Sequence, residues 1–361
     1  MSAKLQAPRG TRDFYPNDLR LRDWLFGHFR AVARSFGFEE VDAPVVESQE
    51  LFTRKAGEEI VEQLYAFELH DRKLALRPEM TPSIARMVMA RAGGLRLPLR
   101  WFTVTQNWRY ERMTRGRKRE HYQWNMDVWG EPGVTAEAEL IAAIFALFDR
   151  VGLGTGEARV RVSSRALLEE TLGRSVLAGR PEAFPALCVA IDKLDKIGPD
   201  AVLELLTDPA GEVKLARSDA EHVVAWLGLD DLEAASESLA QDSPALHGLR
   251  ELFRWLEAYG VRDRVDFDTS IVRGLAYYTG IVFEAFDAGR RLRALCGGGR
   301  YDRLLETLGG PAIPAVGFGF GDAVIAELLA DRGLWPDLSR PVDDFVYARE
   351  EAQRPHAIRA A

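Results

Sequence analysis

The segment at residues 106–129, QNWRYERMTRGRKREHYQWNMDVW, constrains the fold most, because side chains alternate in character on both sides of a basic cluster. Successive side chains of a β-strand point to opposite faces of a sheet. The odd positions after the cluster are polar, and the even positions are the apolar Tyr122, Trp124, Met126 and Val128. The segment therefore predicts two strands joined by a basic loop, with one face packed on a core and the other forming a polar floor.

The predicted floor carries both signs of charge, on Arg109, Glu111, Gln123 and Asp127. Arginine offers a planar fork to phosphate, whereas carboxylates and amides bind an amine or an adenine edge. A charge run on its own is more often a solvated hairpin. The aromatic side chains of the opposite face, and the acids at the same parity as Arg109, favour a site for a ligand with phosphate and ammonium groups.

The first part of the chain alternates helix and strand signals, and the length of 361 residues favours two or three domains. A long amphipathic helix is expected at residues 18–37. The next strand is interrupted by Pro44, a residue tolerated mainly at a sheet edge or an interface. A helix then begins with Thr81 as its N-cap and Pro82 as its first residue.

The second part begins with helical segments that fill residues 164–260 and predict an inserted helical module. Strand signals return afterwards, with a hairpin turn at 287–290 and the glycine-rich strand AVGFGFG before a helix from Asp322. One more strand is expected at 342–348 and a helix from about Pro355.

Composition excludes several kinds of site and partner. The two cysteines, Cys188 and Cys296, are far apart, and the histidines lack ligand spacing, so neither a disulfide nor a protein-bound metal is predicted. No stretch approaches the roughly 20 apolar residues of a membrane helix. The formal net charge of -8 argues against nonspecific DNA binding. We expect a cytoplasmic protein without membrane or DNA partners.

Four further motifs accompany the 106–129 segment: PRGTRDFYP, LALRPEMTPSIARMV, IVRGLAYYTGIVFEAF and GGGRYDRL. In this order they resemble histidyl-tRNA synthetase, a class II aminoacyl-tRNA synthetase. The resemblance implies an α+β fold, with an antiparallel sheet flanked by helices and an inserted helical domain. It also implies a homodimer formed through the element around Pro44.

The resemblance divides the chain into five parts. They are a catalytic core in two pieces at 1–163 and 261–334, the helical insertion at 164–260, a linker at 335–341 and the start of a truncated anticodon-binding domain at 342–361.

The implied activity is the ATP-dependent activation of L-histidine and its transfer to histidine tRNA, with Mg²⁺ accompanying ATP. The implied catalytic residues are Arg109 and Arg273. The implied ATP-binding residues are Arg109, Glu111, Arg117, Arg119 and His121. The implied histidine-binding residues are Glu79, Thr81, Gln123, Asp127, Arg273, Tyr277, Tyr278 and Tyr301. Arg112 and Arg115 would contact the acceptor end of tRNA.

The sequence departs from the family pattern at Asp127, where many members have Glu, and at Ala276, which replaces a common Asp. Two further departures bear on the activity. Ala323 and Val324 stand where the family has a Glu-Arg pair, and the chain ends soon after the anticodon-binding domain would begin. Both are consistent with an alternative, a non-catalytic synthetase-like regulatory subunit of ATP phosphoribosyltransferase, in which histidine would act as a feedback signal. The arginines of the floor and loop favour the enzyme, since a regulator has no need of Arg109 and Arg117 in phosphate-reading positions.

Overall fold

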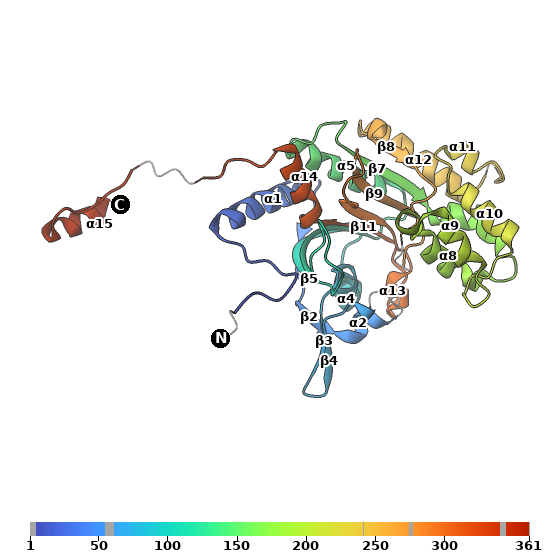
Figure 1. Ribbon diagram of the computed structural model, residues 1–361, viewed down its shortest axis with the longest axis horizontal. Helices are drawn as coiled ribbons and strands as arrows, with labels where there is room; N and C mark the ends of the chain where they lie inside the picture. Colours follow the sequence, from blue (N-terminus) through green and yellow to red (C-terminus); the bar gives the residue numbers. More distant parts are fainter. Residues whose placement is uncertain (1–4, 55–60, 241, 274–276, 340–343, 361) are drawn as a thin grey trace.

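The computed structural model describes residues 5–54, 61–240, 242–273, 277–339 and 344–360, and it is built on an eight-stranded sheet (Figure 1). In spatial order the strands are β1 (Glu39–Glu40), β5 (Leu99–Trp108), β6 (Glu120–Trp129), β11 (Ala315–Gly321), β10 (Cys296–Arg300), β9 (Ile281–Asp287), β7 (Ala158–Ser164) and β8 (Val265–Phe267). The predicted α+β fold is confirmed. The sheet is not wholly antiparallel, because β1 and β8 pair in parallel with their neighbours at the two edges.

The two strands predicted around the basic loop are β5 and β6. They pair in antiparallel fashion, with Thr105 opposite Gln123 and Asn107 opposite His121. The predicted apolar face of β6 is buried, since Trp124 and Met126 are fully buried. Strand parity therefore identified the apolar face of β6 correctly. Beyond β5, which ends at Trp108, the aromatic Tyr110 of the same parity is 54% exposed and does not extend that face.

Three helices cover this apolar face: α1 (Pro16–Ser35), α5 (Thr135–Arg150) and α14 (Asp322–Arg332). The Phe29 ring of α1 stacks on Trp124 of β6, with ring centroids 5.1 Å apart. Phe148 of α5 meets Phe320 of β11 edge-on, with centroids 6.0 Å apart. Helix α1 buries one stripe of side chains, as the amphipathic pattern predicted.

The opposite face is covered by α4 (Thr81–Arg91) and α13 (Leu304–Thr307). Thr81 was predicted as the N-cap of α4, but Met80 holds that position and Thr81 is the first helical residue. Pro82 follows it in the first turn, where the missing N–H of proline leaves no helical hydrogen bond unmade.

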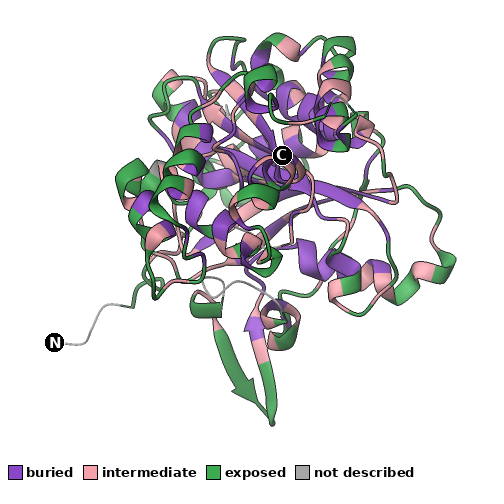
Figure 2. Ribbon diagram, turned by 90° about the vertical axis from the view of Figure 1, so that its right-hand side faces the viewer, coloured by how far each residue is buried: buried purple, intermediate pink, exposed green. Residues whose placement is uncertain are grey.

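Beside α4 lies a small sheet with the order β2 (Val46–Ser48), β4 (Arg72–Leu76) and β3 (Ala66–Leu69), next to α2 (Gln49–Thr53). The strand predicted to be interrupted at Pro44 is two strands, β1 and β2, which belong to different sheets. Proline lacks the N–H that a continuous strand would donate, so the chain changes sheets there. The β3–β4 hairpin is the most exposed part of this sheet (Figure 2).

The predicted helical module comprises α6 (Arg165–Leu168), α7 (Arg174–Val176), α8 (Phe184–Ile191), α9 (Leu194–Thr207), α10 (Arg217–Trp226), α11 (Leu232–Ala235) and α12 (Pro244–Ala258). Its apolar side chains are not a separate core. Leu187, Val223 and Leu249 belong to the same buried cluster as Val162 of β7 and Phe145 of α5. The module is therefore packed as an extension of the sheet's core.

The last described segment ends in α15 (Arg354–Ala360), which projects from the body in Figure 1. The strand predicted at 342–348 is not formed at 344–348, and residues 342 and 343 lie outside the described residues. Phe345 and Tyr347 are exposed there, at 82% and 64%. A lone extended segment without a neighbouring strand has no partner for its backbone groups. None of the helices in the described residues is both long and apolar enough to cross a membrane.

Candidate active site

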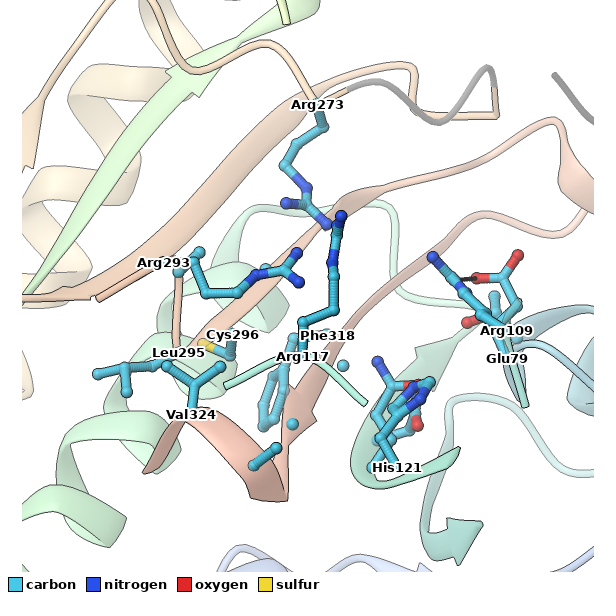
Figure 3. Close-up of a pocket in the computed structure, with 18 of the residues that line it drawn as sticks. Glu79, Arg109, Arg117, His121, Arg273, Arg293, Leu295, Cys296, Phe318 and Val324 are labelled. Carbon is cyan, nitrogen blue, oxygen red and sulfur yellow. Dashed lines mark ion pairs between the residues drawn. The ribbon is translucent and has the colours of Figure 1, made fainter. Parts of the chain in front are cut away.

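A cavity of about 280 Å³ lies on the polar side of the central sheet. Its walls come from the start of α4, the β5–β6 strands with their basic loop, the segment before β9, and the glycine-rich strands β10 and β11 (Figure 3). Most predicted site residues line it: Glu79, Thr81, Arg109, Glu111, Arg117, His121, Gln123, Arg273, Tyr277, Tyr278 and Tyr301. Residues nearly 200 positions apart in the sequence thus meet in one cavity, as when the Tyr277 hydroxyl donates a 3.2 Å hydrogen bond to Glu79.

One end of the cavity is rich in guanidinium groups. Arg117 and Arg273 point toward one another in Figure 3. An ion pair of 2.5 Å joins Arg117 to Glu111, and Arg273 pairs with Glu284 of β9. Arg109 lies between this end and the acidic end. Its Nε donates to the Pro78 carbonyl over 3.0 Å, and its other nitrogens lie 3.9 Å from carboxylate oxygens of Glu79 and Glu111. This end suits a ligand with several negative charges.

The other end is acidic. The Tyr301 hydroxyl donates a hydrogen bond to Asp127, and both residues are buried. Burial, opposed by this hydrogen bond and reinforced by the charge of Glu79, raises the pKa of Asp127 to about 7. Burial also raises the pKa of Glu79, although Arg109 and the Tyr277 hydroxyl oppose the shift. Two acids held away from water form a site that an ammonium group would stabilise.

Glycines make room for these polar side chains on the same sheet. In β11 the phenylalanines Phe318 and Phe320 enter the core, while the intervening glycines face the cavity. A Cβ at Gly317 would collide with the Tyr301 hydroxyl and Asp127, and one at Gly319 would collide with Gln123. In the pattern GFGFG, the phenylalanines thus fill the core face of β11, and the glycines leave room on its cavity face.

His121 lies at the floor of the cavity, near Arg109. Burial, followed by the positive charges of Arg109 and Arg12, lowers the pKa of His121 to about 3. The imidazole is therefore neutral at physiological pH, so it can stack on or hydrogen-bond to an aromatic ring but cannot act as a cation.

Arg165 holds the segment that carries Arg273. Its guanidinium is buried and donates to the carbonyls of Val272, Arg273 and Tyr278, over 3.0, 2.7 and 2.9 Å. Arg273 has a φ of +62°, a backbone conformation that is uncommon for residues other than glycine. The middle of the RGLAYY motif, residues 274–276, lies outside the described residues.

Four predicted residues do not line the cavity. Asp127 lies beneath it and takes part through Tyr301. The Arg119 guanidinium lies over the Tyr110 ring, 3.7 Å from its centroid, instead of facing the cavity. Arg112 is exposed on the loop, and Arg115 forms ion pairs of 3.0 and 2.5 Å with the α14 acids Glu327 and Asp331. Strand parity stops at Trp108, where β5 ends, so it could not predict where the loop side chains point.

The cavity also contains residues that the sequence reasoning did not select: Gln63, Lys118, Asn125, Asp192 and Arg293. Asn125 has the parity of Gln123, so the strand pattern pointed to it. Asp192 follows α8 of the helical module, and no local pattern indicated that this module reaches the floor. Arg293 belongs to an irregular segment between β9 and β10, where side-chain periodicity gives no direction.

No group of three or more His, Cys, Asp or Glu side chains that could hold a metal ion occurs among the described residues.

Comparisons with known proteins identify the family of the chain. A family model described as histidyl-tRNA synthetase matches residues 10–321. The chloroplastic/mitochondrial histidine–tRNA ligase of Arabidopsis thaliana is 50% identical over 346 residues, which are 95% of this chain and 70% of that protein. The histidine–tRNA ligase of Opitutus terrae is 39% identical over 371 residues, covering 99% of this chain and 82% of that protein.

Solved structures share the fold. The histidyl-tRNA synthetase of Nostoc sp. PCC 7120 has a TM-score of 0.79 at 24% identity, covering 99% of this chain and 83% of that one. An ATP phosphoribosyltransferase regulatory subunit/histidyl-tRNA synthetase from Bacillus halodurans C has a TM-score of 0.80 at 24% identity, covering 100% and 90% of the two chains. At these identities the likeness concerns the fold alone.

Proposed function

Because the chain belongs to the histidyl-tRNA synthetase family, we propose that it activates L-histidine with ATP and transfers the histidyl group to histidine tRNA. The observation that carries this proposal is a single cavity with guanidinium groups at one end and buried acids at the other. Such a cavity can hold a polyphosphate and an amino acid side by side.

In the first step an oxygen of the histidine carboxylate attacks the α-phosphorus of ATP. The new carboxyl–phosphorus bond replaces the bond from that phosphorus to the bridging oxygen, and pyrophosphate leaves with the electron pair. The step needs no protein nucleophile, so its catalysis rests on alignment and on stabilising negative charge. We assign Arg109 and Arg273 to the α-phosphate and the attacking carboxylate, and Arg117 to the outer phosphates.

We assign the acidic end of the cavity to the histidine substrate. Glu79 and Asp127, held by Tyr277 and Tyr301, would face the ammonium group, and Gln123 would hydrogen-bond to it. Thr81 and Tyr278 also line the cavity. A buried pair of acids is costly when empty and is stabilised by a bound cation, so recognition of the ammonium is strong and selective.

Glu111 and the neutral His121 are assigned to the adenine ring. The Glu111 side chain is largely buried, at 9% exposed, but lines the cavity beside Arg109 and Arg117, so its carboxylate can accept a hydrogen bond from the adenine amino group. Arg119 is left out of this assignment, since its guanidinium is stacked on Tyr110.

In the second step a terminal ribose hydroxyl of tRNA attacks the carbonyl carbon of the adenylate, and AMP leaves. The proton of that hydroxyl passes to the departing phosphate. The exposed Arg112 and the neighbouring Arg115 lie on the basic loop at the cavity, which supports their assignment to the acceptor end. Phosphate contacts of this kind position the nucleic acid without reading its sequence.

We further propose that Mg²⁺ enters with ATP, because the described residues offer no resident metal site. We propose a homodimer as well. Apolar side chains are exposed on the small sheet and the segment before it, at Val45, Val46 and Phe67. Burial of such a patch against a second copy would be favourable.

The division into a catalytic core at 1–163 and 261–334 and an insertion at 164–260 remains part of the proposal. Asp192 supports a functional link, since it brings the insertion to the cavity wall. The assignment of 342–361 to an anticodon-binding domain stays a prediction.

The regulatory-subunit alternative is disfavoured by the relatives at 39% and 50% identity, which are named as ligases. The structure whose title mentions a regulatory subunit is 24% identical and supports only the fold.

The test is the exchange of labelled pyrophosphate into ATP, measured with purified protein and Mg²⁺ for each amino acid in turn. We expect exchange with histidine alone. An Arg273→Ala protein purified identically should lose exchange by about 10²-fold or more, which controls for contaminating host enzyme. Absence of histidine-dependent exchange, with histidine still bound in calorimetry, would overturn the enzymatic proposal in favour of the regulator.

A further inference from the structure

Arg293 reaches the guanidinium end of the cavity from the segment that joins β9 to β10. Its guanidinium points toward those of Arg117 and Arg273 in Figure 3. The three side chains come from three separate segments, the basic loop, the segment before β9, and the β9–β10 connection. Their convergence is therefore a property of the fold and not of one basic stretch.

The three arginines differ in their partners. Arg117 is paired with Glu111, and Arg273 with Glu284. Within the part of the chain that the structure describes, Arg293 has neither a hydrogen bond nor an ion pair. Of these three arginines, Arg293 is therefore the one whose hydrogen-bond donors are all available to a ligand.

Arg293 is an exposed residue that lies near charges of both signs. Its pKa is lowered, first by desolvation at the cavity wall and then by the charge of Arg117; the charge of Glu111 opposes this shift, and Arg109 and Arg273 reinforce it. Arginine stays protonated at physiological pH in spite of such a shift. Repulsion among permanently charged groups is relieved when an anion with several charges binds between them.

The α14 side of the same cavity supplies no charge. Ala323 and Val324 line it, and Val324 packs on the basic loop, with its Cγ2 3.2 Å from the position that a Cβ on Gly116 would occupy. A cation for the far end of a bound polyphosphate must therefore come from another element. Arg293 lies beside this apolar wall, next to Leu295 (Figure 3).

We propose that Arg293 binds the β- and γ-phosphates of ATP and the pyrophosphate that leaves, supplying from the β9–β10 connection the charge that α14 lacks. This inference rests on the proposed function for the identity of the nucleotide. It adds a phosphate-binding residue that sequence motifs did not indicate.

The experiment compares Arg293→Ala with a matched control, Arg291→Ala. Arg291 lies two positions away in the same segment and is exposed, as Arg293 is, but it does not line the cavity. Its substitution by alanine removes the same charge. Binding of ATP, AMP and inorganic pyrophosphate to each full-length variant is measured by calorimetry. Histidine-dependent pyrophosphate exchange is measured on the same preparations, at varied ATP and varied pyrophosphate.

Arg293→Ala should weaken the binding of ATP and pyrophosphate by about 10- to 100-fold, the range of a charge-assisted contact, and leave AMP binding within about twofold. Arg291→Ala should match the unaltered protein for all three ligands. In exchange, the KM values for ATP and pyrophosphate should rise, while the KM for histidine stays constant.

Equal losses for ATP and AMP, or Arg293→Ala values equal to those of Arg291→Ala, would overturn the proposal. Failure of the unaltered protein to exchange pyrophosphate would instead count against the proposed function. The binding of pyrophosphate to the two variants would still decide whether Arg293 contacts a polyphosphate.

Discussion

The Tyr301 hydroxyl donates a hydrogen bond to Asp127 across Gly317, a residue whose missing side chain leaves room for both groups. Asp127 is 1% exposed and Tyr301 2% exposed, so this contact is closed to water. The hydrogen bond only partly offsets the cost of burying the carboxylate, and the pKa of Asp127 remains raised to about 7.

Histidine affinity should depend on the ionisation of Asp127. An ammonium group binds the ionised acid, so affinity should rise by about tenfold per pH unit up to about pH 7 and then level off. Calorimetric titrations between pH 5.5 and 8.5 measure this slope. Asp127→Asn should bind histidine more weakly and lose this component of the slope, and that comparison separates it from titration of the imidazole of the ligand. An unchanged slope in Asp127→Asn would contradict the prediction.

The same substitution should stabilise the unliganded fold in alkaline solution. Asp127 has a folded pKa of about 7, above its ordinary value of 3.8, so its contribution to stability is present below pH 3.8 and is lost as pH rises through 7. Asparagine has no charge to bury. The Tm advantage of Asp127→Asn should therefore grow between about pH 4 and 7 and stay constant above it, as thermal melts can show. A Tm advantage of Asp127→Asn that falls with rising pH would show that folding lowers the pKa of Asp127, contrary to the prediction.

Gly297→Ala should impair catalysis while the fold survives. A Cβ at Gly297 would lie 2.5 Å from the Cζ of Arg273, so the guanidinium must move from its place over β10. We expect adenylate formation to fall by about 10²-fold, with a smaller change in Tm. Gly27→Ala is the matched control, because a Cβ there meets nothing within 4 Å and the site is helical. Normal turnover in Gly297→Ala would show that catalysis does not require the Arg273 guanidinium to lie over β10.

Arg165→Lys should lower kcat more than it changes the KM for either substrate. Lysine keeps the positive charge but lacks the planar fork that bonds to the carbonyls on both sides of residues 274–276. Arg165 touches no substrate in the proposed arrangement, so its effect passes through Arg273 and Tyr278. Pyrophosphate exchange at varied ATP and histidine separates kcat from KM. An unaltered kcat in Arg165→Lys would show that Arg165 does not position Arg273 for catalysis.

The polar floor could be predicted from the sequence because β5 and β6 are long, regular strands. Parity placed Gln123 on the cavity side of the sheet and Trp124 in the core, and the structure agrees. Strand parity could not predict how deeply each side chain is buried. Asp127 has the same parity as Gln123, but it lies opposite Gly317, beneath the cavity. The edge strand β1, two residues long, is too short for a periodic pattern, so its parallel pairing was missed.

Loop residues were predicted less well, since their direction depends on tertiary contacts. Arg119 belongs to the basic cluster but stacks on Tyr110, and Arg115 is held by the acids of α14. Arg293 and Asp192 reach the cavity only because the sheet and the helical module bring distant segments together. No local sequence signal contains that information.

The shared apolar cluster predicts that the helical module and the sheet unfold as one cooperative unit. Leu249 of the module and Phe145 behind the sheet lie in the same cluster, so melting either part exposes apolar surface of the other. The boundary at residue 164 marks a change in sequence character, and we expect no independent unfolding on its two sides. A ligand in the cavity should then stabilise the module as well as the floor, so that the energy of substrate binding is distributed over the whole folded body.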